Sequence, residues 1–435
     1  MNKDSFTYQA IEDFRPRIEK TNRLEIAWIV FLLAIIGLGF FALYTQITKG
    51  HIVTGMRDNV VWGIYIVNFI FFMGVSYSGA LISGPLHLFR ANWRLPIIRM
   101  AEYLTIISLL IGPLYILLCI GRLDKLHYLV IFGRIQSPIT WDVIAISTDL
   151  IGCFIFLYYA VLRDLASLRD YPNLKLPKWR KRFYKFLALG YTGTPEQEKR
   201  LKRATDIMAA MIVAIAIIVY SVLAWIFSVT LQPGWHSTIF GPYFVIAAVY
   251  SGIGVMIVVM YIYRKIYHLE KYITKKHFVN MGIMMLVLAA FFGYFTFSEY
   301  LTKWYGSEKN DEQLIKILFS RYYWPFIFSN YVGVLLPMII IAIPQFRTIN
   351  AITISAVIVI IALWFNRYLI VIPTLESPYL PIQDSRPDWV HYKGTWVEWS
   401  LSAAGIALMC LLYTLAGKFL PIVQVSEPFE LEENN

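Results

Sequence analysis

Ten apolar runs, each long enough to cross the hydrocarbon core of a bilayer, dominate this 435-residue sequence. A run of about 20 apolar residues indicates a transmembrane helix, because a helix satisfies its own backbone hydrogen bonds where water is absent. Only 15% of the residues are charged, against about 25% in soluble domains. The sequence therefore predicts an all-α integral membrane protein, with spans near residues 24–47, 62–88, 96–120, 141–163, 204–229, 238–263, 278–302, 323–345, 350–372 and 396–420.

Lysine and arginine residues gather in alternate loops. Residues 163–203 hold twelve of them, including the run "KWRKRFYK". Cytoplasmic loops carry such an excess, so we expect both termini in the cytoplasm, with the acidic tail 426–435 disordered. The net charge of +11 indicates contact with anionic lipid rather than with nucleic acid. The loops after the second and sixth spans add Arg90, Arg94, Arg99, Arg264, Lys265, Lys271, Lys275 and Lys276.

Two short motifs recur in the second and sixth spans. "WGIYIV" leads to "YSGALI" in one span, and "FGPYFV" leads to "YSGIGV" in the other. Both spans run the same way through the membrane, as in a parallel repeat. We therefore expect two four-helix bundles and two flanking helices. The N-terminus and first helix occupy residues 1–61, the first bundle 62–229, the second bundle 230–372, and an outer loop, the tenth helix and the tail 373–435.

Three loops on the opposite side are rich in Trp, Tyr and Pro: 121–140, 303–322 and 373–395. The aromatic belt at the membrane interface explains most of these residues. The remainder predict a docking surface for another protein on the outer face.

Histidine and cysteine placement argues against bound redox metals. None of the seven histidines lies in the middle third of a span, whereas a cytochrome b holds its haem between histidines of facing helices. The three cysteines form no C-x-x-C motif and are expected to be small buried residues. We predict no haem, no iron–sulfur cluster and no metal site in this chain.

Polar residues of the first predicted bundle lie at graded depths, and ionisable groups within a membrane usually mark a functional path. Asp142 and Asp149 are seven residues apart, which places them on one helix face. With Glu102 near the cytoplasm they predict a proton path. Its supporting residues are Asn68, Tyr77, Ser78, Tyr103, Ser147 and Thr148.

Each acid also has a structural alternative. Asp142 can cap its helix after "SPIT", Asp149 can pair with a neighbouring hydroxyl, and Glu102 can pair with Arg99 or Arg94. The second predicted bundle has fewer polar residues, namely Glu299, Asn330, Asn366 and Arg367. There we expect Glu299 and Arg367 to form a structural ion pair.

Four segments resemble the NrfD/PsrC family of polysulfide reductase membrane subunits, and most closely the large membrane subunits of alternative complex III. They are "GMRDNVVWGIYIVNFIFFMGVSYSGALISG", "GRLDKLHYL…SPITWDVIAIS", "PGWHSTIFGPYFVIAAVYSG" and "FNRYLIVIP". The resemblance implies a cofactor-free subunit of a respiratory complex in the bacterial inner membrane. It implies an iron–sulfur protein on the outer face, with a related membrane subunit and cytochrome subunits as further partners.

The same resemblance implies that a quinone binds at the outer end of the first bundle, near Arg122, His127, Trp141 and Asp142. One position departs from the pattern. Quinol-oxidising relatives commonly have a histidine just before the "GR" that ends the third span, and here that stretch reads Cys119-Ile120-Gly121-Arg122.

Three functions follow from these observations. The chain is a quinol-binding membrane subunit of a redox complex, or a sister subunit that anchors the complex and moves protons without binding quinone. As a third alternative it is a secondary transporter, although it lacks Gly- or Pro-broken helices at matching positions of the two halves. A transporter would purify alone, whereas the other two would bring partner proteins.

Overall fold

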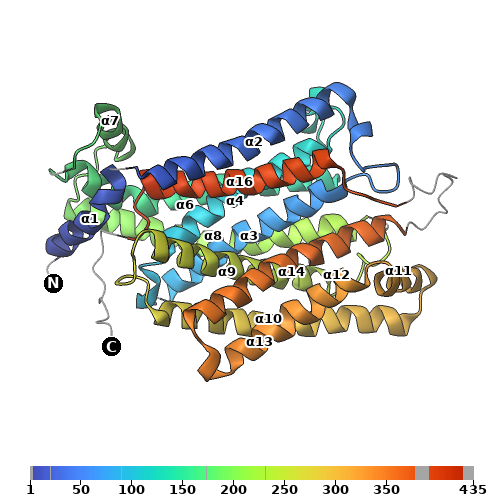
Figure 1. Ribbon diagram of the computed structural model, residues 1–435. Helices are drawn as coiled ribbons and strands as arrows, with labels where there is room; N and C mark the ends of the chain where they lie inside the picture. The colour runs from blue at the N-terminus through green and yellow to red at the C-terminus, as the bar shows by residue number, and fades with distance from the viewer. Residues whose placement is uncertain are drawn as a thin grey trace.

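All ten predicted spans are helical in the computed structural model of the protein (Figure 1), which describes residues 3–19, 21–89, 91–172, 174–230, 232–377 and 391–424. No β-strand occurs in these ranges. The prediction of an all-α membrane protein is confirmed. The spans are α2 (Arg23–Lys49), α3 (Gly63–Leu88), α4 (Ile98–Cys119), α6 (Pro138–Asp170), α8 (Pro195–Ser228), α9 (Phe240–Ile266), α10 (Lys275–Gly306), α12 to α13 (Tyr323–Ala342), α14 (Ile349–Leu375) and α16 (Trp396–Phe419).

Short helices lie at the two ends of the spans. α1 (Lys3–Glu19) and α7 (Lys178–Leu187) lie at the end where α16 finishes and where the basic loops gather, here termed the basic end (Figure 1). α11 (Lys309–Ser320) lies at the opposite, outer end. That the basic end faces the cytoplasm stays a prediction. The other short elements are η1 (His51–Val53), η2 (Asn92–Arg94), η3 (Leu123–Lys125), α5 (Tyr128–Ile131) and η5 (Pro344–Phe346).

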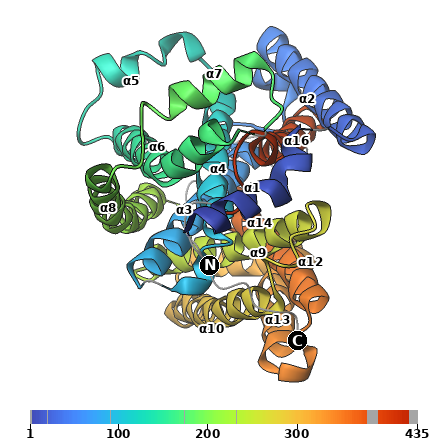
Figure 2. The same ribbon diagram turned by 90° about the vertical axis from the view of Figure 1, so that its left-hand side faces the viewer.

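The spans form two rings of four. α3, α4, α6 and α8 contact one another in that order and close on α3, and α9, α10, α13 and α14 do the same. Contact between α3 and α9 joins the two bundles, and the end-on view shows α2 beside α16 at the edge of the first bundle (Figure 2). This is the expected arrangement of two four-helix bundles and two flanking helices.

The repeated "YSG" segments explain the close packing of α3 against α9 and against α4. A Cβ atom on Gly252 would lie 1.5 Å from Ser78 Oγ, and one on Gly79 would lie 2.3 Å from Thr105 Oγ1. Only glycine therefore permits the observed approach of α3 to α9 and to α4, as small residues commonly do between membrane helices.

α6 and α8 extend well beyond the predicted spans 141–163 and 204–229. α8 begins early because Thr194 accepts a hydrogen bond from Gln197 N and Pro195 occupies the first helical position. α7 packs against α6, and Arg180 on α7 donates to Ile18 O of α1 at 2.9 Å. The basic loop is therefore an ordered layer at the basic end.

The eighth span contains a π-helical turn. Phe328–Val332 (η4) separates α12 (Tyr323–Ile327) from α13 (Gly333–Ala342). Such turns are rare and occur frequently at functional sites.

Candidate functional site

Asp149 is a fully buried acid of the first bundle. Its side chain is fully buried on α6, Oδ1 accepts a contact from the Cys153 thiol at 3.4 Å, and Oδ2 has no hydrogen-bond partner among the described residues. The alternative pairing with a hydroxyl is therefore wrong, because the contacting group is the thiol of Cys153, one helical turn away. Asp149 forms no ion pair among the described residues.

Two buried tyrosines lie inside the first bundle. Tyr77 on α3 interacts electrostatically with Asp149 and Asp142. Its ring lies 4.9 Å from that of Tyr220 on α8, edge to face. Neither tyrosine hydroxyl has a hydrogen-bond partner among the described residues. Tyr77, Tyr220 and Asp149 thus supply three unsatisfied polar groups inside the first bundle.

Asp142 lies two turns closer to the outer end of α6 and is half-buried. α6 begins at Pro138 with Ser137 as its N-cap, so Asp142 lies within the helix and the capping alternative is wrong. Within the described ranges, Asp142 forms no ion pair. Asp149 is buried and Asp142 is half-buried, whereas Ile144, Ser147 and Thr148 are exposed, so the two acids share the inward face of α6 that their spacing predicted.

Ser147 and Thr148 do not lie beside Asp149. Both are exposed, and the Thr148 hydroxyl donates to Ile144 O at 2.8 Å on its own helix. Successive helical residues are about 100° apart, so the neighbours of a buried aspartate face elsewhere. Their predicted role in supporting the proton path is therefore corrected.

The outer residues predicted for a quinone pocket divide into two groups. Trp141 and Asp142 lie on α6, whereas Arg122 and His127 are exposed in the segment 121–136. Arg122 donates to Asp124 at 3.1 Å, and this hydrogen bond lowers the pKa of the Asp124 carboxyl. The remaining contacts stay within this segment and the start of α6, since His127 packs on Tyr128 and Trp141 Nε1 donates to Ile135 O.

A buried ion cluster lies towards the basic end. Arg99 Nε lies 2.9 Å from Asp164 Oδ2, and Arg99 Nη1 lies 2.8 Å from Glu102 Oε2. None of the three side chains is more than 3% exposed. The alternative pairing of Glu102 with Arg99 is confirmed. Asp164 was not among the predicted residues, because the predicted span ended at residue 163.

A polar cavity of about 430 Å³ leads to this cluster from the basic end. It lies among α3, α4, α6 and α8 and reaches Arg99 and Glu102. His87 Nε2 lies 2.7 Å from Asp206 Oδ1 in its lining. The lining also includes Arg94, Tyr159, Arg163, Lys202, Thr205 and Gln424.

Three other predicted residues make structural contacts. Asn68 donates to Ser402 Oγ at 2.7 Å and accepts from Trp364 Nε1 at 3.0 Å, which joins α3 to α16 and α14. The Tyr103 hydroxyl donates to Pro421 O at 2.8 Å, and the Ser78 hydroxyl donates to Val75 O at 2.7 Å. The side chains of Asn68, Tyr103 and Ser78 thus have hydrogen-bond partners within the protein. Asp149 Oδ2 and the Tyr77 hydroxyl have none among the described residues.

The expected ion pair between Glu299 and Arg367 is wrong. Glu299 pairs with Lys303 one turn along α10 and accepts a hydrogen bond from the Ser237 hydroxyl. Arg367 instead lies over the Phe244 ring, 4.6 Å from its centroid. Lys303 competes successfully because residues four apart on a helix are neighbours. Asn366 Nδ2 donates to the Tyr243 hydroxyl at 2.6 Å.

Several polar residues at the outer end were missed. Glu398 is fully buried and accepts from Gly55 N at 2.7 Å and from the Tyr392 hydroxyl at 2.6 Å. His236, Glu308 and Asp311 bring ligand-type atoms within 4.8 Å of one another, so these three residues have the chemistry to hold a cation. The capping box formed by Thr395 and Glu398 is a local signal that could have found Glu398, whereas Gly55 and His236 are too distant in sequence to leave one. Most of the predicted docking loop 373–395, namely 378–390, and the tail 426–435 lie outside the described residues.

Comparison with known proteins gives matches along most of the chain. The family model described as "Polysulphide reductase, NrfD" matches residues 52–377. A putative dimethyl sulfoxide reductase membrane subunit of Halobacterium salinarum is 28% identical over 56% of this chain, which spans only 53% of that protein. The Hdr-like menaquinol oxidoreductase integral membrane subunit of Archaeoglobus fulgidus is 23% identical over 94% of this chain and 96% of its own. A selenate reductase subunit of Mesobacillus selenatarsenatis is 20% identical over 91% and 93%.

Proposed function

Because this chain belongs to the polysulphide reductase NrfD family, we propose that it is the membrane subunit of a quinol-linked oxidoreductase complex resembling alternative complex III. It carries no haem or iron–sulfur cluster of its own and lies in a bacterial inner membrane with both termini in the cytoplasm. An iron–sulfur protein at the outer end takes the electrons, and a related membrane subunit and cytochrome subunits complete the assembly. The Archaeoglobus relative, a menaquinol oxidoreductase subunit, supports a naphthoquinol as substrate.

The buried, unpaired carboxyl of Asp149 carries the proposal. A purely structural acid at this depth would be expected to have a cation or several hydrogen-bond donors, and Asp149 Oδ2 has neither among the described residues. Oxidation of a quinol releases two protons and two electrons. Asp142, at the outer end of the same face, accepts a proton from the headgroup, and Tyr77 and Asp149 continue the path inward.

The polar cavity at the basic end completes the route. Its lining joins the polar pair of His87 and Asp206 to the buried cluster of Arg99 and Glu102. In this scheme a proton that enters by the cavity then moves from the Arg99 cluster to Asp149 through the interior of the first bundle. Glu102 acts in this scheme as the fixed partner of Arg99 at the inner mouth.

The sister-subunit function is the second candidate, and one observation favours it. Cys119 stands where quinol-oxidising relatives commonly have a histidine, and Arg122 and His127 are exposed rather than gathered around Asp142. In that case the chain anchors the complex and conducts protons, while quinol binds elsewhere. Quinol turnover of an Asp142→Asn complex separates the two candidates.

The partner on the outer face is supported by the apolar surface of segment 121–136. This segment lies between two spans, yet its large apolar side chains are well exposed, among them Val130, Ile131, Phe132 and Ile135. Contiguous exposed apolar surface usually marks an interaction site. We propose that the iron–sulfur partner covers it.

Purification tests the proposed function directly. In mild detergent the chain should bring partner proteins that contain iron, and the isolated chain should then be colourless and free of iron. The reason is that no histidine lies in the middle of a span and the cysteines are unclustered. Optical spectra and iron analysis make the measurement. A stoichiometric Soret band in the isolated chain, or purification without any partner, would overturn the proposal.

Limited trypsin digestion tests the docking surface. Lys125 and Arg134 are exposed in the free chain and should be cut there but protected in the intact complex. Lys181 and Arg182, exposed on α7 at the basic end, serve as controls and should be cut in both states. Equal cleavage at Lys125 in complex and free chain would show that no partner covers the segment.

A further inference from the structure

A second cleft lies in the outer half of the second bundle, far along the chain from Asp142. It has a volume of about 480 Å³ and lies between α10, α11 and the turn formed by α12 and η4. Sites for small molecules usually measure about 300–1,000 Å³. Its walls are mainly aromatic: Phe297, Tyr300, Trp304, Phe319, Phe326 and Tyr331.

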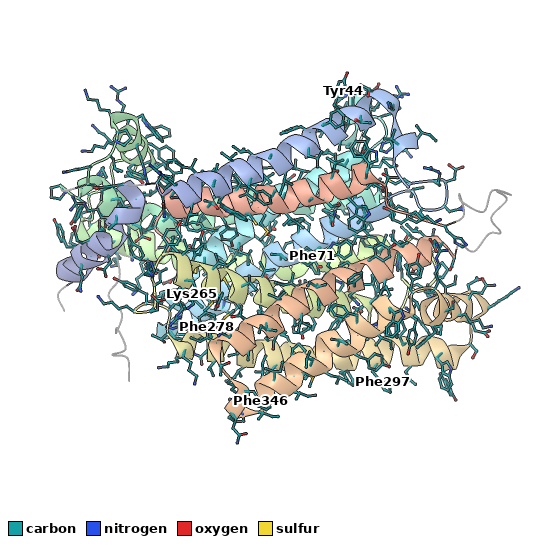
Figure 3. The ribbon with its side chains drawn as sticks, in the orientation of Figure 1. Tyr44, Phe71, Lys265, Phe278, Phe297 and Phe346 are labelled. Atoms are coloured by element: carbon teal, nitrogen blue, oxygen red, sulfur yellow. The ribbon has the colours of Figure 1, made fainter. Side chains whose placement is uncertain are left out.

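The cleft opens sideways, on the surface that the spans present to lipid. Phe297, Trp304 and Tyr331 at its rim are all about half exposed or more. Figure 3 shows Phe297 on the outer surface of the second bundle, pointing away from its interior. α11 closes the cleft towards the outer end. A ligand dissolved in the bilayer therefore reaches it without crossing water.

One buried polar atom points to the chemistry of the ligand. Asn330, on the π-helical turn, is only 9% exposed. Its Nδ2 donates to Phe326 O at 3.2 Å, whereas its Oδ1 has no hydrogen-bond partner among the described residues. A buried acceptor left unsatisfied costs about 1–3 kcal/mol. The free acceptor is therefore matched to a ligand that donates a hydrogen bond.

The lining also contains hydroxyl groups. The Thr296 hydroxyl is buried and has no hydrogen-bond partner among the described residues, so it is a second group that can bind a ring oxygen. The π turn is what brings Asn330 into the wall. The cleft thus combines flat aromatic walls, a mouth in the lipid and two buried polar groups without partners among the described residues, of which Asn330 Oδ1 can only accept a hydrogen bond.

We propose that this cleft binds the hydroxylated ring of a membrane-dissolved quinol and prefers the reduced ring to the oxidised one. Aromatic side chains stack on the flat ring, and a ring hydroxyl donates to Asn330 Oδ1. The oxidised quinone offers only acceptors and leaves Asn330 Oδ1 unsatisfied. The site holds quinol and involves no electron transfer. It goes beyond the proposed function, because it does not depend on quinol oxidation beside Asp142.

Photo-crosslinking of the full chain in lipid nanodiscs tests the proposal. The probe is a naphthoquinone carrying a diazirine, used reduced under argon and oxidised in air, and crosslinked peptides are mapped by mass spectrometry. Leu301→Trp fills the cleft from its rim, where Leu301 is 42% exposed. Ile283→Trp, on the same helix and 40% exposed, is the matched control outside the cleft.

The reduced probe should label peptides of α10, α11 and α12. Leu301→Trp should abolish this labelling and Ile283→Trp should leave it unchanged, with equal thermal stability of the two variants. Asn330→Leu should weaken binding of the reduced probe about five- to tenfold, since one hydrogen bond is lost, and leave the oxidised probe within about twofold.

Three results would overturn the proposal. They are labelling that survives Leu301→Trp, equal affinity for both oxidation states in the wild-type chain, and labelling by a diazirine phospholipid that excess quinol does not displace. The last result would show that an ordinary acyl chain fills the cleft. None of these results bears on Asp142, so the proposed function is tested separately.

Discussion

Asp149→Asn should assemble into a normal complex and lose about a hundredfold or more of its turnover-linked proton movement, since a positioned proton-transfer group contributes about 10²–10⁴-fold. Asparagine keeps the shape of the side chain and removes its titration. Because Asp149 Oδ2 has no partner among the described residues, the substitution breaks no ion pair and the fold should survive. The measurement is proton uptake or release by the complex in liposomes, with quinol as donor and a pH-indicating dye.

Thr148→Val is the matched control for this variant. Thr148 precedes Asp149 on α6 but faces outwards and donates only to Ile144 O, so its replacement should leave both proton movement and turnover unchanged. Full coupled activity in Asp149→Asn would contradict the proton path and assign Asp149 a packing role.

Asp142→Asn then distinguishes the two candidate functions. In a quinol-binding subunit it should reduce quinol turnover more than Asp149→Asn does, because Asp142 is the outer acceptor. In a sister subunit, quinol turnover should persist in Asp142→Asn while proton movement still depends on Asp149.

The second large effect is expected at Arg99. Arg99→Met should lower the free energy of unfolding by about 3–5 kcal/mol, because it leaves the buried carboxylates of Asp164 and Glu102 without their guanidinium. Methionine keeps much of the side-chain length, so the loss reports charge rather than volume. Unfolding of the detergent-solubilised chain, followed by circular dichroism against added denaturant, measures the change.

Two further variants interpret the result. The triple variant Arg99→Met, Glu102→Gln and Asp164→Asn removes the whole cluster and should regain most of the lost stability, because no buried charge remains unpaired. Arg122→Met breaks the exposed ion pair with Asp124 and should cost less than about 1 kcal/mol. Equal losses for Arg99→Met and Arg122→Met would contradict the buried cluster.

The sequence predicted the ten spans well because the bilayer imposes a minimum apolar length that a single window can detect. It missed the last turns of α6 and the first turns of α8, which are rich in charged residues. α6 continues there because it packs against α7, and α8 begins early because Thr194 caps it. It also missed the π turn at Phe328–Val332, because no local residue pattern specifies an inserted residue that neighbouring helices accommodate.

The candidate site was predictable only where its residues are close in sequence. The seven-residue spacing of Asp142 and Asp149 gave their common face, and the four-residue rule would also have paired Glu299 with Lys303. The Arg99–Asp164 pair joins residues 65 apart, and the cleft around Asn330 combines three helices. Such groupings depend on helix rotation and bundle order, which periodicity alone does not fix.

The pairing of α2 with α16 has a consequence for biosynthesis. Trp28 donates to Thr414 at 3.3 Å across 386 residues of sequence, and a ribosome adds about 5–20 residues per second. α2 therefore resides in the bilayer for roughly 20–80 s before its principal neighbour has been made. During that interval lipid must solvate it on nearly every side. Only 17% of the α2 window is buried in the finished fold, so the uncharged stretch between Glu25 and Lys49 faces lipid both before and after α16 joins it.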